Sequence, residues 1–249
     1  MNSNQKNTLK LYPTKSRPLL GLTLLLVEDS RFTCEAVRMM CQRSGARLRR
    51  ADCLKSAERH LVVYRPSVVI VDIGLPDGSG LNLIRKLHHE TPRIPMILGT
   101  SGDELMHHSA RKAGANGFLT KPIESLAAFQ TTLLSNLSAD QRNSGPRALT
   151  EDIIIPTSIA YCDDLRHASR ILNQEPTQSK DYIFNFLEGL CKSTGDSEIV
   201  AVLKEKDING LKSKIDDRIT EISNNQSVGS DEALTKAVRL PKRSFCSPS

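Results

Sequence analysis

Residues 17 to 30 read "RPLLGLTLLLVEDS", an apolar run that ends abruptly in Glu28 and Asp29. The first 20 residues carry four basic residues and no acid, and a basic start before an apolar run is typical of a secretory signal. However, the two acids stand where a signal peptide would have small residues for cleavage. The run therefore favours a buried first strand over export, and we expect a cytoplasmic protein.

Similar short, β-rich apolar runs recur along the chain and alternate with segments of helical 3.6-residue spacing. The runs cover residues 22–27, 46–51, 67–72, 95–100 and 116–121. Strands that alternate with helices pair in parallel through right-handed crossovers. Residues 21–137 are therefore expected to form an α/β domain with a five-stranded parallel, doubly wound sheet. Its last helix is predicted to begin at Pro122 and to run to about Leu137.

The rest of the chain divides by composition into tails, a linker and a helical region. We expect a flexible basic tail over residues 1–20, a linker over 138–150 without apolar period, and a disordered tail over 225–249. Residues 151–224 again show amphipathic spacing, with Ile183, Leu187 and Leu190 among the repeated apolar positions. This region is predicted to be a small all-α output or interaction region.

Composition and charge exclude some classes of function. The 249-residue chain is 39% hydrophobic and 25% charged, and no apolar run approaches the roughly 18 to 20 residues that span a bilayer. The net charge is +6, but residues 150–224 hold nine bases against fourteen acids. An acidic region repels a phosphate backbone, so this half argues against nucleic acid as a partner. No membrane association is expected.

Polar residues follow four of the predicted strands. Glu28 and Asp29 end the first strand, Asp72 the third, Thr100 the fourth and Lys121 the fifth. The carboxyl ends of parallel strands meet at one edge, where ligands bind. Three converging carboxylates suit Mg²⁺, which would also neutralise an arriving phosphoryl group, and a carboxylate on a central strand is a suitable nucleophile for it.

These residues and their surroundings resemble the receiver domain of bacterial two-component response regulators. The resemblance covers residues 21–137, with its flavodoxin-like fold, and rests on "LLLVEDS", "VDIGLPDGSG", "PMILGTSGD" and "AGANGFLTKP". It implies the following roles: Asp72 as phosphoacceptor; Glu28, Asp29, Asp72 and the backbone carbonyl of Gly74 as Mg²⁺ ligands; Thr100 and Lys121 as sensors of the phosphoryl group; and Phe118 as the switch aromatic. It also implies a cis Lys121–Pro122 bond.

Three glycines qualify the resemblance. Gly74 and Gly102 lie two residues past Asp72 and Thr100 and have no side chain to order or block a hydrolytic water, so the lifetime of an acyl phosphate is not predicted. Gly99 replaces the bulkier apolar residue typical of this strand position, and a glycine within a strand is expected to loosen it.

The stretch "NFLEGLCKSTGDSEI" from Asn185 has a faint resemblance to the motif of histidine phosphotransfer domains. Leu187, Gly189 and Gly195 fit that motif, but Asn185 stands in place of the phosphorylated histidine and Glu188 in place of a lysine. A neutral amide cannot accept a phosphoryl group, so such a domain would be inactive. An ordinary amphipathic helix is the preferred interpretation.

Together these features predict a response regulator that takes a phosphoryl group onto Asp72 in a Mg²⁺-dependent reaction and then switches protein–protein interactions. Expected partners are a sensor histidine kinase or phosphotransfer protein and a downstream protein, with a homodimer left open. It would be no enzyme beyond its own phosphoryl transfer. One alternative is a DNA-binding transcription regulator that uses the C-terminal region. Another is a metal-dependent phosphotransferase or hydrolase, for which the sequence offers no second general base near Asp72.

Overall fold

The computed structural model describes residues 12–137, 152–174 and 180–227. The chain divides into two compact units, one of Met1–Asp29 with Ala36–Ile155 and the other of Ser30–Glu35 with Pro156–Ser249. The predicted linker at 138–150 lies outside the described residues, as do most of the two predicted tails.

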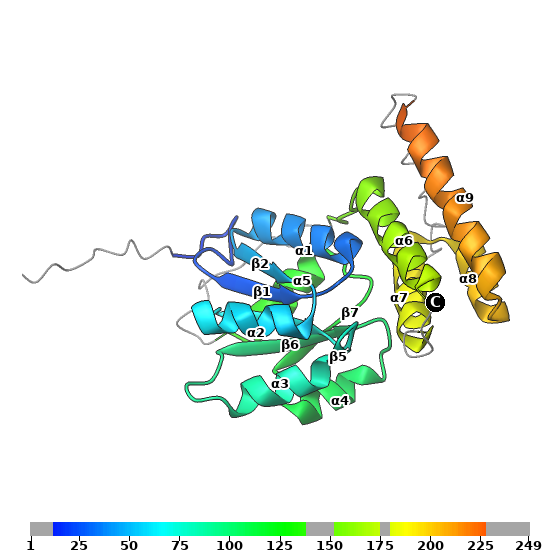
Figure 1. Cartoon of the computed structure of the whole chain (residues 1–249). Helices are drawn as coiled ribbons and strands as arrows, with labels where there is room; N and C mark the ends of the chain where they lie inside the picture. The colour runs from blue at the N-terminus through cyan, green and yellow to red at the C-terminus, as the bar shows by residue number, and fades with distance from the viewer. Residues whose placement is uncertain (1–11, 138–151, 175–179, 228–249) are drawn as a thin grey trace, which may run out of the picture. The chain divides into compact units, whose positions relative to one another are not determined.

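The first unit is built on a parallel sheet (Figure 1). Its strands, in spatial order, are β2 (Arg47–Ala51), β1 (Thr23–Val27), β3 (Val68–Asp72), β6 (Met96–Ser101) and β7 (Gly117–Thr120). All four pairings in this sheet are parallel. Two short strands, β4 (Gly74–Leu75) and β5 (Gly78–Ser79), form a separate antiparallel pair. The structure thus confirms the predicted five-stranded doubly wound fold.

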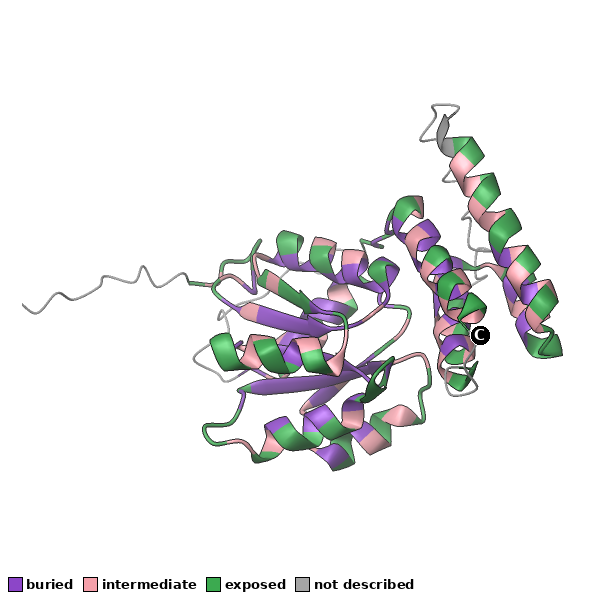
Figure 2. Cartoon of the chain, in the orientation of Figure 1, coloured by how far each residue is buried: buried purple, intermediate pink, exposed green. Residues whose placement is uncertain are grey.

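Burial of the strands follows their composition. β3 is buried along its whole length and β1 over all but its first residue, whereas β2 at the edge exposes most of its residues (Figure 2). A strand covered on both faces must be apolar on both faces, which explains the continuous run "VVIV" in β3. The edge position of β2 explains its three arginines.

Helices cover both faces of this sheet (Figure 1). On one face, α2 (Leu54–Val63), α3 (Gly80–His89) and α4 (Met106–Ala113) share a core with Val69, Val71 and other inward-facing strand residues. On the other face lie α1 (Arg31–Ser44) and α5 (Leu126–Ser135). The Gln130 amide joins these two helices because it donates a buried hydrogen bond to Ser44 Oγ at 2.9 Å.

The predicted start of the last helix of this unit was wrong. α5 begins at Leu126 rather than at Pro122, and the Ser125 side chain caps it by accepting a hydrogen bond from the Ala128 N–H. The backbone just before the helix pairs instead with residues 152–154, through Leu126 N–H to the Asp152 carbonyl and Ile154 N–H to the Glu124 carbonyl. Residues 152–155 consequently belong to this unit, not to the helical region that was predicted to begin at 151.

The predicted flexible tail also ends before residue 20. Leu19 is fully buried, and its N–H donates to the Ser44 carbonyl at 2.9 Å. Gly45 allows this approach, because a Cβ there would lie 2.9 Å from Arg17 Cβ and its φ of 85° is unfavourable for other residues. Residues 17–20 therefore pack against the end of α1.

The second unit is helical. It contains α6 (Ser158–Asn173), α7 (Lys180–Thr194), α8 (Ser197–Glu205) and α9 (Ile208–Ser227), which continues past residue 224, where the helical region was predicted to end. The predicted apolar stripe on α7 is confirmed, since Ile183, Leu187 and Leu190 are buried in one core. Phe32, from the first turn of α1, belongs to the same core. No described helix is long and apolar enough to cross a membrane.

Candidate functional site: an acidic cluster with a buried lysine

The sheet brings the predicted residues together at the carboxyl ends of its strands. Glu28 follows β1 directly and its N–H donates to the Ala51 carbonyl, which fixes the end of that strand. Asp72 and Thr100 end up as neighbours because they are register partners on β3 and β6. Lys121 follows β7, and its N–H donates to the Ser101 carbonyl at 2.9 Å. Hydrogen bonding between neighbouring strands thus positions each side chain.

Three carboxyl groups form the acidic part of the site. One ligand oxygen from each of Glu28, Asp29 and Asp72 lies within 4.8 Å of the others. Glu28 is fully buried and Asp72 is nearly so, whereas Asp29 is partly exposed. Carboxylates this close repel one another in a poorly hydrated site, so the cluster requires a cation to be stable in its ionised form.

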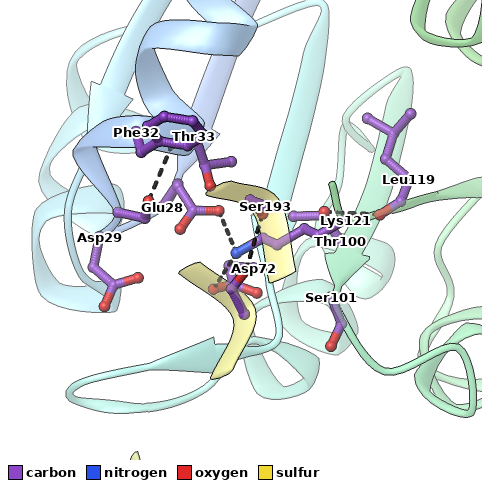
Figure 3. Close-up of polar contacts among 12 residues, drawn as sticks. Glu28, Asp29, Phe32, Thr33, Asp72, Thr100, Ser101, Leu119, Lys121 and Ser193 are labelled. Atoms are coloured by element: carbon purple, nitrogen blue, oxygen red, sulfur yellow. Dashed lines mark hydrogen bonds and ion pairs between the residues drawn. The ribbon is translucent and has the colours of Figure 1, made fainter. Parts of the chain in front are cut away.

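Lys121 supplies one positive charge to this cluster (Figure 3). Its Nζ lies 2.7 Å from Glu28 Oε2 and donates to Asp72 Oδ2 at 3.0 Å. Only 12% of the Lys121 side chain is exposed, so these contacts are shielded from water. The ammonium group therefore bridges the carboxyl groups that follow β1 and end β3.

Burial and charge shift the pKa values of this pair. Burial raises the pKa of Glu28 well above its ordinary range; the Lys121 ammonium lowers it, and Asp72 and Asp29 raise it further. Burial alone would lower the pKa of Lys121, but the carboxylates of Asp72, Glu28 and Asp29 raise it above its ordinary value. Lys121 is consequently charged, and the cluster still favours a further positive charge or a proton on Glu28.

The donor set fits a small, hard divalent cation. All the side-chain ligands are carboxylate oxygens, which Mg²⁺ prefers over nitrogen or sulfur, and the partly exposed Asp29 leaves a side open to water or a phosphoryl oxygen. The cluster could therefore hold a metal ion with Glu28, Asp29 and Asp72 as ligands. Gly74 lies in β4, two residues past Asp72, where an added Cβ would contact nothing within 4 Å. A role for its carbonyl as a ligand stays a prediction.

Thr100 is fully buried and its hydroxyl is engaged. Thr100 Oγ1 donates to the Leu119 carbonyl on β7 at 2.8 Å (Figure 3). The Lys121–Pro122 peptide bond is cis, as the resemblance implied. Gly80 is the first residue of α3 and approaches the Asp72 carbonyl so closely that a Cβ at this position would collide with it. The sequence motif contained this glycine, but only the structure gives its reason.

Phe118 is half-buried and packs against Gly99. A Cβ added to Gly99 would lie 3.1 Å from Phe118 Cδ2 and 2.9 Å from Ala110 Cβ. Gly99 therefore provides the space in which the Phe118 ring lies, rather than only loosening the strand as the sequence suggested. The ring also meets the exposed His107 edge-on, with 5.4 Å between centroids. Sequence reasoning missed His107, because no local pattern links α4 to β7.

The comparison with known families agrees with this geometry. The model of the response regulator receiver domain matches residues 24–131, which include every site residue named above. Residues 24–131 form a response regulator receiver domain. Within this receiver domain lie the acidic cluster and Lys121, to which the sequence resemblance assigned the phosphoryl-transfer roles; those roles stay a prediction.

Curated relatives of the receiver domain are regulators. The protein TcrX of Mycobacterium tuberculosis is 31% identical over 137 residues, which cover 54% of this chain and 58% of TcrX. The virulence transcriptional regulatory protein PhoP of Shigella flexneri is 27% identical over 177 residues, covering 70% of this chain and 74% of PhoP. The chain thus spans less than two thirds of TcrX.

Solved structures similar to the chain match about half of it. The chemotaxis response regulator CheY4 of Vibrio cholerae is 21% identical, with a TM-score of 0.42, over 47% of this chain and 98% of CheY4. A two-component response regulator from Clostridium difficile is 17% identical, with a TM-score of 0.42, over 46% of this chain and 94% of its own.

The helical unit holds the residues of the second, fainter resemblance. Asn185 and Glu188 are exposed on α7, and Glu188 pairs with Lys192 at 2.8 Å one turn later. Leu187 is fully buried in the helical core. These positions are those of an amphipathic helix with a charged outer face, which was the preferred interpretation.

Proposed function

We propose that the chain is a cytoplasmic response regulator of a two-component phosphorelay that accepts a phosphoryl group on Asp72 in a Mg²⁺-dependent reaction. The observation that carries this proposal is the convergence of three carboxyl groups within 4.8 Å, two of which, those of Glu28 and Asp72, pair with the buried Lys121. The receiver match over residues 24–131 supports it.

Each residue has a chemical part in the transfer. A carboxylate oxygen of Asp72 attacks the phosphorus of a phosphohistidine or of acetyl phosphate, the bond from phosphorus to the leaving group breaks, and the leaving group departs with the bonding electrons. When bound, Mg²⁺ would neutralise charge on the phosphoryl oxygens. Glu28, Asp29 and the Gly74 carbonyl would help to hold it, and the Lys121 ammonium would bind one phosphoryl oxygen.

Thr100 and Phe118 would report the modified state. A phosphoryl oxygen offers the Thr100 hydroxyl a charged acceptor in place of the Leu119 carbonyl, and charged acceptors form the stronger hydrogen bonds. Gly99 directly precedes Thr100 in β6 and lies against the Phe118 ring, so a movement of β6 would change the space in which that ring packs. The surface near Phe118 would then bind a downstream protein, with a homodimer as a further arrangement.

Intact-mass spectrometry tests the phosphorylation. Incubation of the full chain with Mg²⁺ and acetyl phosphate should add about 80 Da, the mass of one phosphoryl group. Asp72→Asn should abolish the gain, and omission of Mg²⁺ should suppress it. Asp217→Asn is the matched control, because Asp217 is an exposed acid on α9 outside the site. A gain that survives Asp72→Asn would refute Asp72 as the acceptor.

A second candidate is a DNA-binding transcription regulator. It is favoured by the similarity to PhoP, a transcriptional regulatory protein, because the match covers 70% of this chain and so extends beyond the receiver domain. The acidic balance of residues 150–224 opposes it. Affinity of the full phosphorylated chain for duplex DNA, measured at several salt concentrations, separates the two: a regulator that contacts phosphates would lose affinity steeply as salt rises.

A further inference from the structure

The first turn of α1 is part of the helical unit. Residues Ser30–Glu35 group with Pro156–Ser249 rather than with the receiver residues on either side of them in the sequence. Ser30 follows Asp29, a member of the acidic cluster, directly in the chain. The helical unit therefore contains the residues that immediately follow the metal-binding segment.

Asp164 on α6 holds this turn. Its Oδ2 accepts hydrogen bonds from Ser30 Oγ at 2.8 Å and from the Phe32 N–H at 3.0 Å, while its Oδ1 accepts from the Arg31 N–H at 2.7 Å. The first N–H groups of a helix have no partner within the helix, so an acceptor from elsewhere stabilises it. Asp164 is 1% exposed, which makes these charge-assisted bonds stronger and their loss more costly.

Other contacts fix the same turn from the same helix. Glu35 Oε2 accepts hydrogen bonds from the N–H and the hydroxyl of Thr157, the residue that caps α6. The Phe32 ring packs edge-on against Tyr161, with 6.4 Å between ring centroids, inside the helical core. The start of each helix is thus bound by an acid from the other helix.

We propose that Asp164 is a positioning residue for the metal site. By holding Ser30, Arg31 and Phe32 in one arrangement, it restricts the backbone that leaves Asp29 and so holds that carboxylate ready for Mg²⁺. The proposal rests on the proposed Mg²⁺-binding function of the receiver domain. Because coupling between two sites is reciprocal, Mg²⁺ binding must in turn stabilise the bonds to Asp164.

Calorimetric titration of the full chain with Mg²⁺ tests whether Asp164 affects the Mg²⁺ affinity. We expect Asp164→Ala to weaken Mg²⁺ binding about fivefold, since loss of a helix cap typically changes an equilibrium by this order. Asp207→Ala is the matched control: Asp207 accepts from the Asn209 N–H at the start of α9, which belongs to the same unit as Ser30–Glu35. Both variants should lower the melting temperature, but only Asp164→Ala should change the Mg²⁺ affinity.

Hydrogen exchange in the unmodified chain tests the reciprocal effect, in which Mg²⁺ binding stabilises the hydrogen bonds to Asp164. This measurement does not depend on the folding of any variant. Addition of Mg²⁺ should slow exchange of the Arg31 and Phe32 amide protons, which bind Asp164. The Asn209 amide, bound to Asp207, should exchange at the same rate with and without Mg²⁺.

Equal Mg²⁺ affinity in Asp164→Ala and the unmodified chain, together with unchanged exchange at Arg31 and Phe32, would overturn the positioning role while leaving the Mg²⁺ site intact. An unmodified chain that binds no Mg²⁺ would overturn both the proposed function and this inference. Weaker binding in both Asp164→Ala and Asp207→Ala would also overturn it, because the effect would then follow general destabilisation of the helical unit.

Discussion

The Thr100 hydroxyl donates its one proton to the Leu119 carbonyl, 2.8 Å away across the boundary between β6 and β7. A hydroxyl has a single hydrogen to donate, so this bond must break before Thr100 can donate to a phosphoryl group on Asp72. In the proposed phosphorylated state the two acceptors would compete for this proton, and we expect the exchange of acceptor to change the arrangement of β6.

Replacing Thr100 with valine should separate phosphorylation from its consequence. We expect Thr100→Val to gain the phosphoryl mass as the unmodified chain does, but to show a smaller change in amide exchange over β6 and β7 on phosphorylation. Loss of the buried hydrogen bond should also lower the free energy of unfolding by about 1 kcal/mol. Thr220→Val, which removes an exposed hydroxyl that donates to the Asp216 carbonyl, should leave both properties close to normal.

Removal of the Lys121 charge should destabilise the site. In Lys121→Met, Glu28 and Asp72 lose the ammonium that compensates them, which should cost about 3 kcal/mol of unfolding free energy. Mg²⁺ should recover part of this loss, because it restores positive charge to the cluster.

Urea unfolding with and without Mg²⁺ measures both effects. Lys86→Met is the control, since Lys86 and its partner Glu58 are about half exposed and such a pair contributes roughly 0 to 1 kcal/mol. Equal losses in the two variants would contradict a special role of the buried lysine.

The space beside Phe118 should tolerate no side chain at residue 99. Gly99→Ala places a Cβ 2.9 Å from Ala110 Cβ and 3.1 Å from the Phe118 ring, and such overpacking typically costs about 1 to 3 kcal/mol. Gly189→Ala on α7 meets nothing within 4 Å and should stabilise the chain by up to about 1 kcal/mol, since alanine favours a helix.

A double-mutant cycle identifies the neighbour that is displaced. If the Phe118 ring must move, Gly99→Ala should cost less in a Phe118→Leu background than in the unmodified chain. Additive losses in the thermal unfolding of the three variants would place the strain on Ala110 instead.

Cys41 on α1 should be unreactive in the folded chain. Burial raises the pKa of its thiol to about 12 from the ordinary value of 9.0, so almost no thiolate exists near pH 8. Because the thiol has a higher pKa in the folded state than in the unfolded state, its contribution to the free energy of unfolding is fully present below pH 9.0. This contribution is lost as the pH rises towards about 12, since only the unfolded chain can ionise the thiol in that range.

Alkylation with iodoacetamide, followed by peptide mass spectrometry, checks this prediction. Cys41 should remain unmodified at pH 8 in the native chain and react readily in urea. Rapid alkylation of native Cys41 at pH 8 would contradict the buried thiol.

The sequence predicted the sheet and the convergence of the acids with Lys121 well, because both depend on local signals. Apolar runs such as "VVIV" mark strands directly, and acids at strand ends converge once the strands are parallel. Glu28, Asp72 and Lys121 could therefore be placed together before their contacts were known. The space at Gly99 could not, because it depends on how Phe118 and Ala110 pack against β6.

Unit boundaries were harder to predict from composition. The start of α5 was placed at Pro122 because proline suits a first turn. In the structure Ser125 caps the helix, and the backbone just before it forms hydrogen bonds with the backbone of residues 152–154. The bonds from Ser30 and Phe32 to Asp164 join residues more than 130 positions apart. Hydrophobic periodicity and turn residues describe only neighbouring positions in the sequence, so they could not predict these hydrogen bonds.

The membership of Ser30–Glu35 in the helical unit limits how the chain can be recombined. A gene fusion that attached residues 156–249 to a foreign receiver would bring the helices without Phe32 from their core and without the Ser30 hydroxyl that donates to Asp164. The helical unit of such a hybrid would form its complete core only if the α1 helix of the new receiver supplied equivalent residues. The two halves should therefore change together in evolution rather than be exchanged as separate cassettes.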